Sequence, residues 1–365
     1  MQQRRSLWRV SRILVAVLPF LTSSGVCAQV SQSNRPDNEA GKEQSRAPKA
    51  SAHTSVDEDD LPVKIFERFT TPSLEGSHLE ADEGLVLETD DDDPAFTREL
   101  IRIQWRPGDP IDLYVVKPTR VTLPPVILYL YGYPSEPRRF LDTDFCRSLT
   151  ANGFAAVGFA SALTGQRYHD RPMKEWFVSE LPEALATSAH DVQMILNYLD
   201  RRKDFDLSRV GIYGDGSGAT IAILAAAVDP RIMSLDLVDP WGDWPNWIAA
   251  SPRIPEKERP AFLTPEFLRK VALLDPMKWL PELKTKSVRL QFVDTLTPAS
   301  SRQLEAAAPR QAKVIDYPDP QSFLGAASHD KNFAWIKQQL QPDFVRQYGV
   351  DEPAIQKPGS QLSKR

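Results

Sequence analysis

The sequence has no excess of positive charge and no apolar run long enough to cross a membrane. Its formal net charge is −5 at pH 7, which argues against a nucleic-acid partner because phosphate binding requires a basic surface. A membrane-spanning helix needs about 20 apolar residues, and the apolar segment near the N-terminus, Ile13–Leu21, is far shorter. We therefore expect no nucleic-acid partner and no membrane span.

The first residues have the three regions of an export signal. A basic region ends at Arg12, an apolar region covers Ile13–Leu21, and small residues surround Cys27 just before Gln29. We expect residues 1–28 to be a signal peptide that is removed, so that the protein is periplasmic or secreted. An adjacent pair of arginines in the basic region leaves the Sec and Tat export routes both open.

Cysteine is scarce as well, with 2 residues in a chain of 365. After cleavage before Gln29 only Cys146 would remain, which excludes an internal disulfide. The rest of the composition, with 41% apolar and 25% charged residues, is ordinary for a soluble globular protein.

The length suits one large domain with flanking tails. Residues 29–60 contain almost no large apolar side chains, so we expect a disordered linker there. The domain itself should cover residues 61–340, and the polar residues 341–365 should form a flexible tail. The chain has 31 prolines, which favours long loops and a lid-like insertion.

Strand and helix patterns alternate through most of the domain, which is typical of a mostly parallel sheet covered by helices on both faces. Two alternating runs, Leu100–Trp105 and Ile111–Val116, predict an antiparallel hairpin at one edge. Further strands are expected at Val126–Tyr131, Phe154–Phe159, Arg209–Tyr213, Leu235–Val238, Val288–Val293 and Lys313–Tyr317. Helices are expected at Asp142–Asn152, Ala189–Leu199, Ala219–Val228 and Asn332–Leu340.

About fifty residues without a strand pattern, approximately 240–286, separate two of these strands. They are rich in tryptophan and proline, including Trp241, Trp244 and Trp247. An insertion here would lie at the carboxyl ends of the strands, where open α/β sheets bind ligands. It is either an aromatic cap over a pocket or a small helical lid whose tryptophans pack on one another.

The stretch Gly214-Asp215-Gly216-Ser217-Gly218 lies between a predicted strand and a predicted helix. This is the setting of the nucleophile elbow G-x-S-x-G. The outer glycines, Gly214 and Gly218, are both present, but the central position is Gly216 instead of serine. The nearby Ser217 is one residue too late, so the sequence has the elbow's frame without its nucleophile.

Together with other motifs in the same order, this elbow resembles the α/β-hydrolase superfamily over residues 99–340. The similarity is greatest to the branch of the prolyl oligopeptidase catalytic domain and dienelactone hydrolase. It is carried by Ile111–Val116, Val126–Pro134, His190-Asp191-Val192 and Arg209–Gly218. The resemblance implies an α/β-hydrolase fold and an oxyanion hole formed by the backbone amides of Tyr133 and Ser217.

The same resemblance places the catalytic triad at three positions, and none has the required side chain. The nucleophile position is Gly216, the acid position is Leu296, and the base position is Gln321, which cannot take a proton near neutral pH. Three separate losses beside intact framing residues indicate a pseudo-hydrolase that binds a small molecule, a peptide or a protein partner. We expect no cofactor and no metal.

An alternative is a serine esterase or peptidase with a rearranged triad. Ser217 would be the nucleophile, His329 the base, and Asp294 or Asp239 the acid. Each also has a structural explanation: Ser217 as the first residue of a helix, Asp294 as a loop carboxylate, and His329 as an exposed histidine at a helix start. A third possibility is an interaction protein whose crevice has collapsed.

Two further features have weaker functional interpretations. The four consecutive aspartates Asp90–Asp93 are acidic enough for a calcium loop, but they lack its alternating spacing and its glycine. We expect a solvated acidic turn instead. His169 lies between two arginines in a loop and is expected to be polar surface.

Overall fold

The structure is a computed structural model that describes residues 74, 83–106, 109–133, 137–163, 167, 181–293, 297–327 and 331–341. All of them belong to one compact unit, 57–365. The predicted signal peptide, linker and C-terminal tail lie outside the described residues. Among the helices that are described, none is both long enough and apolar enough to cross a membrane.

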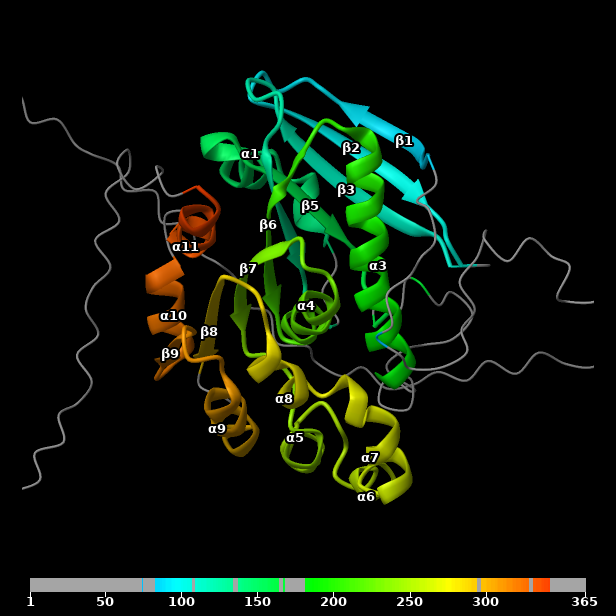
Figure 1. The fold of residues 1–365 in the computed structure, drawn as a ribbon, viewed down its shortest axis with the longest axis vertical. Helices are drawn as coiled ribbons and strands as arrows, with labels where there is room; N and C mark the ends of the chain where they lie inside the picture. The colour runs from blue at the N-terminus through cyan, green and yellow to red at the C-terminus, as the bar shows by residue number, and fades with distance from the viewer. Residues whose placement is uncertain are drawn as a thin grey trace, which may run out of the picture. The chain divides into compact units, whose positions relative to one another are not determined.

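The described part of the unit is built on a nine-stranded sheet with the order β1-β2-β3-β5-β4-β6-β7-β8-β9 (Figure 1). Neighbouring strands from β5 to β9 in this order are parallel, and β1, β2 and β3 are antiparallel to their neighbours. The strands are Leu85–Asp90 (β1), Phe96–Ile103 (β2), Ile111–Pro118 (β3), Pro125–Leu130 (β4), Ala155–Phe159 (β5), Asp206–Asp215 (β6), Ile232–Val238 (β7), Ser287–Val293 (β8) and Lys313–Tyr317 (β9). The predicted parallel sheet with an antiparallel edge hairpin is confirmed.

Strand β1 was not expected from the sequence. Its side chains are exposed on both faces of the sheet apart from the half-buried Asp90, so it lacks the alternation of apolar and polar residues that marks a half-buried strand. Its pairing with β2 also shifts register between Val86 and Glu88. The neighbouring hairpin has that alternation on β3, and its register pairs Ile101 with Leu113.

The central strands separate two apolar layers. On β4, Val126, Leu128 and Leu130 belong to the cluster that contains α3 and α4, whereas Ile127 and Tyr129 belong to the cluster that contains α1 and α11. Successive side chains of a strand point to opposite faces, so helices cover both faces as expected. These helices are α1 (Thr143–Thr150), α3 (Leu181–Arg202), α4 (Ser217–Val228) and α11 (Lys331–Leu340).

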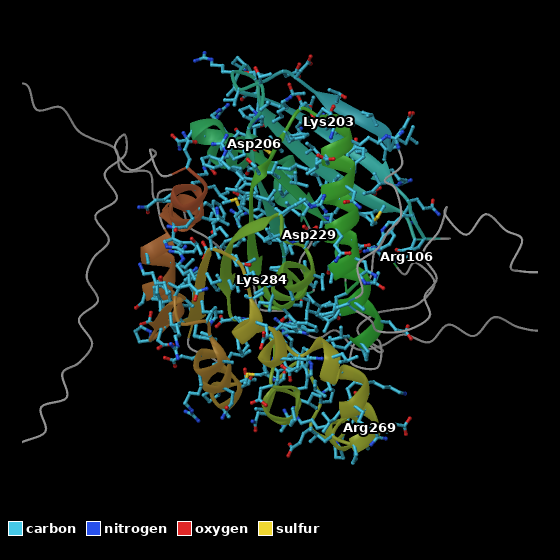
Figure 2. All side chains as sticks on the ribbon, in the orientation of Figure 1. Arg106, Lys203, Asp206, Asp229, Arg269 and Lys284 are labelled. Atoms are coloured by element: carbon cyan, nitrogen blue, oxygen red, sulfur yellow. The ribbon has the colours of Figure 1, made fainter. Side chains whose placement is uncertain are left out.

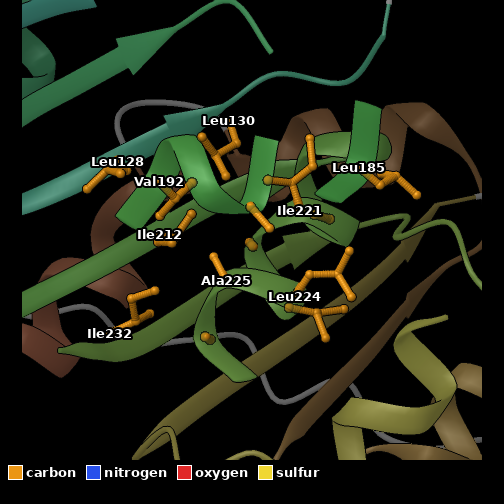
Figure 3. Close-up of a cluster of buried hydrophobic side chains, with 14 of the residues drawn as sticks. Leu128, Leu130, Leu185, Val192, Ile212, Ile221, Leu224, Ala225 and Ile232 are labelled. Carbon is orange, nitrogen blue, oxygen red and sulfur yellow. The ribbon is translucent and has the colours of Figure 1, made fainter. Parts of the chain in front are cut away.

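Helix α4 is buried over almost its whole length, from Ser217 to Ala226. It is apolar on all sides, as expected of a helix enclosed by its neighbours. Figure 3 shows Ile221 and Leu224 of this helix among side chains from α3 and the central strands. The helix begins two residues earlier than the predicted Ala219, directly after the elbow glycine. Its first residue is therefore buried at the point where the candidate site begins.

Helix α3 begins at Leu181, well before the predicted Ala189. Leu181 and Leu185 are fully buried and extend the apolar face of the helix toward its N-terminus. Pro182 is tolerated in the first turn because no intrahelical hydrogen bond needs its missing N–H. Helix α3 and helix α4 pack against each other on the same face of the sheet (Figure 1).

A buried network of charges joins α3 to the β2–β3 turn. Asp191 of α3 is fully buried and accepts hydrogen bonds from Arg106 at 2.7 Å and from Arg167 at 2.5 Å. Asp109 also pairs with both arginines. Arg106 lies beside α3 in Figure 2. Burial raises the pKa of Asp191, but the two guanidiniums outweigh burial and hold the pKa below its usual value.

The segment between β7 and β8 is helical and contains no strand. Its tryptophans pack on one another, with ring centroids 4.8 Å apart for Trp241 and Trp247 and 5.8 Å apart for Trp244 and Trp247. All three rings are buried, as the helical-lid interpretation expects. The helices here are α5 (Trp244–Ala250), α6 (Arg259–Phe262), α7 (Pro265–Val271) and α8 (Pro276–Trp279), with 3-10 helices η5 (Ala272–Leu274) and η6 (Leu280–Glu282).

The remaining helices lie in connections between strands or near the end of the unit. Helix α9 (Pro298–Ala307) lies between β8 and β9, and α10 (Pro320–Ala327) between β9 and α11. Two short 3-10 helices flank α1: η2 (Pro137–Leu141) and η3 (Ala151–Gly153). Neither α9 nor α10 was expected from the sequence.

Candidate functional site

The candidate site lies where the central strand β6 turns into α4. The turn residue is Gly216, with φ 53° and ψ −118°, and its N–H donates to the carbonyl of Val238 at 2.8 Å. A positive φ of this kind is strained for any residue with a Cβ and is accessible to glycine. The sharp elbow expected from the sequence is therefore present, with glycine at its centre.

Close backbone packing accounts for the two outer glycines of the elbow. A Cβ on Gly218 would lie 2.1 Å from the carbonyl oxygen of Leu130, and a Cβ on Gly214 would lie 2.7 Å from Cα of Ala219. Both contacts are with backbone, which cannot move aside as a flexible side chain can. The frame of the motif is thus required by the packing of strand, turn and helix, whatever residue stands at its centre.

Ser217 is the first residue of α4 and is fully buried. Its Oγ accepts a hydrogen bond of 2.8 Å from the backbone N–H of Tyr133, in the loop after β4. The structure therefore brings together the two residues whose amides were predicted to form an oxyanion hole. It also directs the hydroxyl of Ser217 to one of those amides.

Trp241 lies beside the elbow, which the sequence did not indicate. A Cβ built on Gly216 would lie 3.3 Å from Nε1 of Trp241. The backbone of Trp241 is held by Thr220 of α4, whose Oγ1 donates to the carbonyl of Trp241 at 2.7 Å and accepts from its N–H at 2.9 Å. The sequence shows that this segment is rich in tryptophan, but it does not indicate which of the rings reaches the elbow.

Two carboxylates also lie at the ends of the central strands. Asp239 follows β7 with φ 45°, and its Oδ1 accepts from the N–H of Val293 at 2.9 Å. Burial raises the pKa of Asp239 to about 6, the N–H of Val293 opposes this, and the charge of Asp215 adds to the rise. Burial likewise raises the pKa of Asp215, which Arg253 partly offsets.

The predicted acid and base positions are only partly described. Gln321, at the family's base position, is exposed on α10. Leu296 at the acid position, with Asp294 and His329 of the alternative triad, lies outside the described residues, as does His169. The structure thus locates Ser217 and Asp239 of that triad and leaves its other members as predictions.

The acidic turn at Asp90–Asp93 connects neighbouring elements. Asp90 pairs with Arg98 of β2, and Asp93 pairs with Arg147 of α1 at 2.6 Å. Asp91 and Asp92 remain exposed. Among the described residues, no group of three or more His, Cys, Asp or Glu side chains is arranged to hold a metal ion.

No protein-family model matches the chain, and no curated protein matches its sequence. Solved structures do match. A puromycin-hydrolyzing peptidase of Mycobacterium tuberculosis matches with a TM-score of 0.51 and 15% identity, over 69% of this chain and 40% of that chain. An acetyl xylan esterase from Paenibacillus sp. R4 matches with a TM-score of 0.49 and 18% identity, over 64% of this chain and 81% of that chain.

A cold-adapted esterase from an Arctic intertidal metagenomic library matches with a TM-score of 0.48 and 12% identity, over 70% of this chain and 98% of that chain. At such low identities the likeness concerns the fold alone. The match to the peptidase agrees with the mostly parallel sheet covered by helices on both faces, which the sequence predicts. This chain therefore has the fold of the α/β-hydrolase superfamily.

Proposed function

We propose that this protein is a hydrolase-like protein that binds a ligand at the carboxyl ends of its central strands and lacks serine-nucleophile catalysis at the elbow. The observation that carries the proposal is Gly216, which occupies the elbow and has no side chain to attack a substrate. Acyl transfer of this kind requires a side-chain nucleophile activated by a neighbouring base. The ligand would be a small molecule, a peptide or a protein segment.

The surroundings of the elbow support the same conclusion. The hydroxyl of Ser217 is fully buried and accepts a hydrogen bond from Tyr133, so it faces the protein. Gln321 at the base position is exposed on α10 and has no basic nitrogen. Ligand binding remains feasible because open α/β sheets bind ligands at the carboxyl ends of their strands, where the Trp-rich segment also begins.

The second candidate is a serine esterase or peptidase with a rearranged triad. It is favoured by the name of the matched Mycobacterium tuberculosis structure, a puromycin-hydrolyzing peptidase. It is also favoured by Asp239, a carboxylate at the end of β7 whose pKa burial raises to about 6. In this reading Ser217 would attack, His329 would accept its proton, and Asp239 or Asp294 would orient the histidine.

A fluorophosphonate probe separates the two candidates, because it reacts with activated serines. We expect no labelling of the purified protein and no hydrolysis of p-nitrophenyl esters. Ser217→Ala is the test variant, and Ser208→Ala is the control because Ser208 is exposed at the other end of β6. Labelling that disappears in Ser217→Ala and persists in Ser208→Ala would establish the rearranged hydrolase instead.

We also propose that the protein is exported. The support is the order of basic, apolar and small-residue regions in residues 1–28. N-terminal sequencing of the protein from the cells that make it should find Gln29 as the first residue. A mature protein that still begins with Met1 would contradict the proposal.

A further inference from the structure

The indole of Trp241 stands against the position from which an elbow side chain would project. A Cβ on Gly216 would lie 3.3 Å from Nε1 and 3.7 Å from Cε2 of Trp241. A separation of 3.3 Å is shorter than ordinary van der Waals contact between such atoms, which is about 3.5–4.0 Å. A side chain at residue 216 would therefore meet the edge of the indole at its first atom.

Trp241 is held in this place from several sides. Its backbone is fixed by the two hydrogen bonds to Thr220 of α4. Its ring packs on Trp247, with centroids 4.8 Å apart, and the guanidinium of Arg253 lies 5.2 Å from its centroid. The ring is almost completely buried. It cannot turn away from the elbow without losing its packing on Trp247, and the hydrogen bonds to Thr220 fix the backbone from which it projects.

The backbone amide of Tyr133, predicted to form part of the oxyanion hole, is also hydrogen-bonded within the protein. A carbonyl oxygen at an elbow is polarised by backbone N–H groups, of which Tyr133 supplies one in this fold. Here the N–H of Tyr133 donates to Oγ of Ser217 at 2.8 Å. A substrate carbonyl would have to compete with a hydroxyl that is buried and already in position.

We propose that Trp241 and Ser217 form a built-in plug of the elbow. Trp241 closes the space in which a nucleophilic side chain would stand, and Ser217 occupies an amide that would polarise a substrate carbonyl. This inference rests on the proposed function and states how the elbow is kept inactive. It follows that restoring a side chain at residue 216 does not by itself restore a reactive group.

A cysteine at the elbow tests the plug without requiring a catalytic base, because a thiol reacts with maleimide through its own thiolate. The experiment uses Gly216→Cys in the full chain with Cys27 and Cys146 replaced by alanine. N-ethylmaleimide modification should be at least tenfold slower than in the unfolded chain. Adding Trp241→Ala should then accelerate it at least tenfold.

The control is Trp279→Ala, because the Trp279 indole lies in the same inserted segment and donates to the carbonyl of Leu273 in an exposed hydrogen bond. In the Gly216→Cys background it should leave the modification rate unchanged. Rapid modification of Gly216→Cys with Trp241 intact, or equal acceleration by Trp279→Ala, would overturn the proposal. These rates are independent of fluorophosphonate labelling of the unaltered protein, so failure of the plug and failure of the proposed function are distinguishable.

If Gly216→Cys does not fold, Thr220→Val provides a second test, because Thr220 makes the two hydrogen bonds that hold the backbone of Trp241. Valine has a similar shape but forms neither of the two hydrogen bonds. In protein labelled with 5-fluorotryptophan, the resonance lost in Trp241→Phe identifies the ring. Thr220→Val should shift or broaden that resonance and leave the Trp279 resonance unchanged. An unchanged Trp241 resonance would contradict the proposal that Trp241 is held in place against the elbow.

Discussion

The hydroxyl of Ser217 lies 2.8 Å from the backbone nitrogen of Tyr133, so a side chain of α4 satisfies an amide of the loop after β4. The pair is partly buried, and a hydrogen-bonding group that loses its partner away from water costs about 1–3 kcal/mol. We therefore expect Ser217→Ala to lower the free energy of unfolding by that amount. Urea unfolding measures it.

The control for this substitution is Ser208→Ala. Its hydroxyl also makes a hydrogen bond, to Asp206, but the pair is exposed, so water replaces the lost partner. The change in unfolding free energy should stay below about 1 kcal/mol. Equal effects of the two substitutions would mean that the hydrogen bond between Ser217 and Tyr133 contributes no more to stability than an exposed one.

The pH dependence of the unfolding free energy should reveal the raised pKa of Asp239. Burial raises its pKa to about 6 in the folded chain, compared with an ordinary value of about 3.9. The folded state therefore binds more protons between these two pH values. The contribution of Asp239 to stability is fully present below pH about 4 and is lost as the pH rises through about 6.

Asp239→Asn removes this titration and leaves an oxygen to accept from Val293. Relative to the unaltered protein, the variant should gain about 1–3 kcal/mol between pH 4.5 and pH 8, since one pKa unit corresponds to about 1.4 kcal/mol. Urea unfolding at both pH values gives the difference. Comparing the two proteins at each pH cancels groups common to both, such as Asp191. A difference that does not change with pH would show that Asp239 titrates normally.

The charges that anchor α3 should make a large contribution to folding. Asp191 is fully buried between Arg106 and Arg167, and breaking a buried ion pair leaves charges without a partner, at about 3–5 kcal/mol. Asp191→Ala should cost about this much in urea unfolding. The matched control is Asp112→Ala, because its pair with Arg102 is exposed and worth about 1 kcal/mol or less. Similar losses in the two variants would argue against a special role for the buried network.

The sign of the pH effect is opposite for Asp191. Its pKa is lower in the folded chain, because the two guanidiniums outweigh the effect of burial. Its contribution to stability is therefore present above the unfolded pKa of about 3.9 and is lost as the pH falls through the folded value. Acid should reduce the difference between the unaltered protein and Asp191→Ala.

The elements that the sequence indicated correctly are those with a clear local pattern. Strand β9 has the predicted bounds Lys313–Tyr317, and the elbow appears where its glycines are. Strand β1 was missed because its exposed side chains follow no alternation and its place depends on pairing with β2. Helix α3 was predicted too short because Pro182 in its first turn is a residue that usually marks a break in a helical pattern, although Leu181 and Leu185 continue the apolar face.

The site could be predicted only as far as its local motif reaches. The sequence contains Gly216 and the glycine frame, and its resemblance to the α/β-hydrolases pairs the amides of Tyr133 and Ser217, which the structure brings together. It contains no sign that Trp241 would reach the elbow, because that contact depends on how a later insertion packs on α4. The hydrogen bond between Thr220 and Trp241 is likewise a product of tertiary structure.

The residue at the centre of the elbow has a backbone conformation that favours glycine. Gly216 has φ 53°, and a residue with a Cβ in such a region costs on the order of 1–3 kcal/mol. Gly216→Ser should therefore lower the free energy of unfolding by at least this amount, since its Cβ would also press on Trp241 at 3.3 Å. It should yield almost no ester hydrolysis, because triad members act as a unit and no base stands at Gln321.

Gly216→Ala is the matched control, since it adds the same Cβ and no hydroxyl. The two variants should lose similar stability in urea unfolding, which would assign the loss to the turn and to Trp241 rather than to an unsatisfied hydroxyl. Stability equal to that of the unaltered protein in both variants would mean that the turn at residue 216 is not strained. Efficient cleavage of p-nitrophenyl esters by Gly216→Ser alone would mean that a base survives near the elbow, with His329 the first candidate, and that Trp241 does not close it.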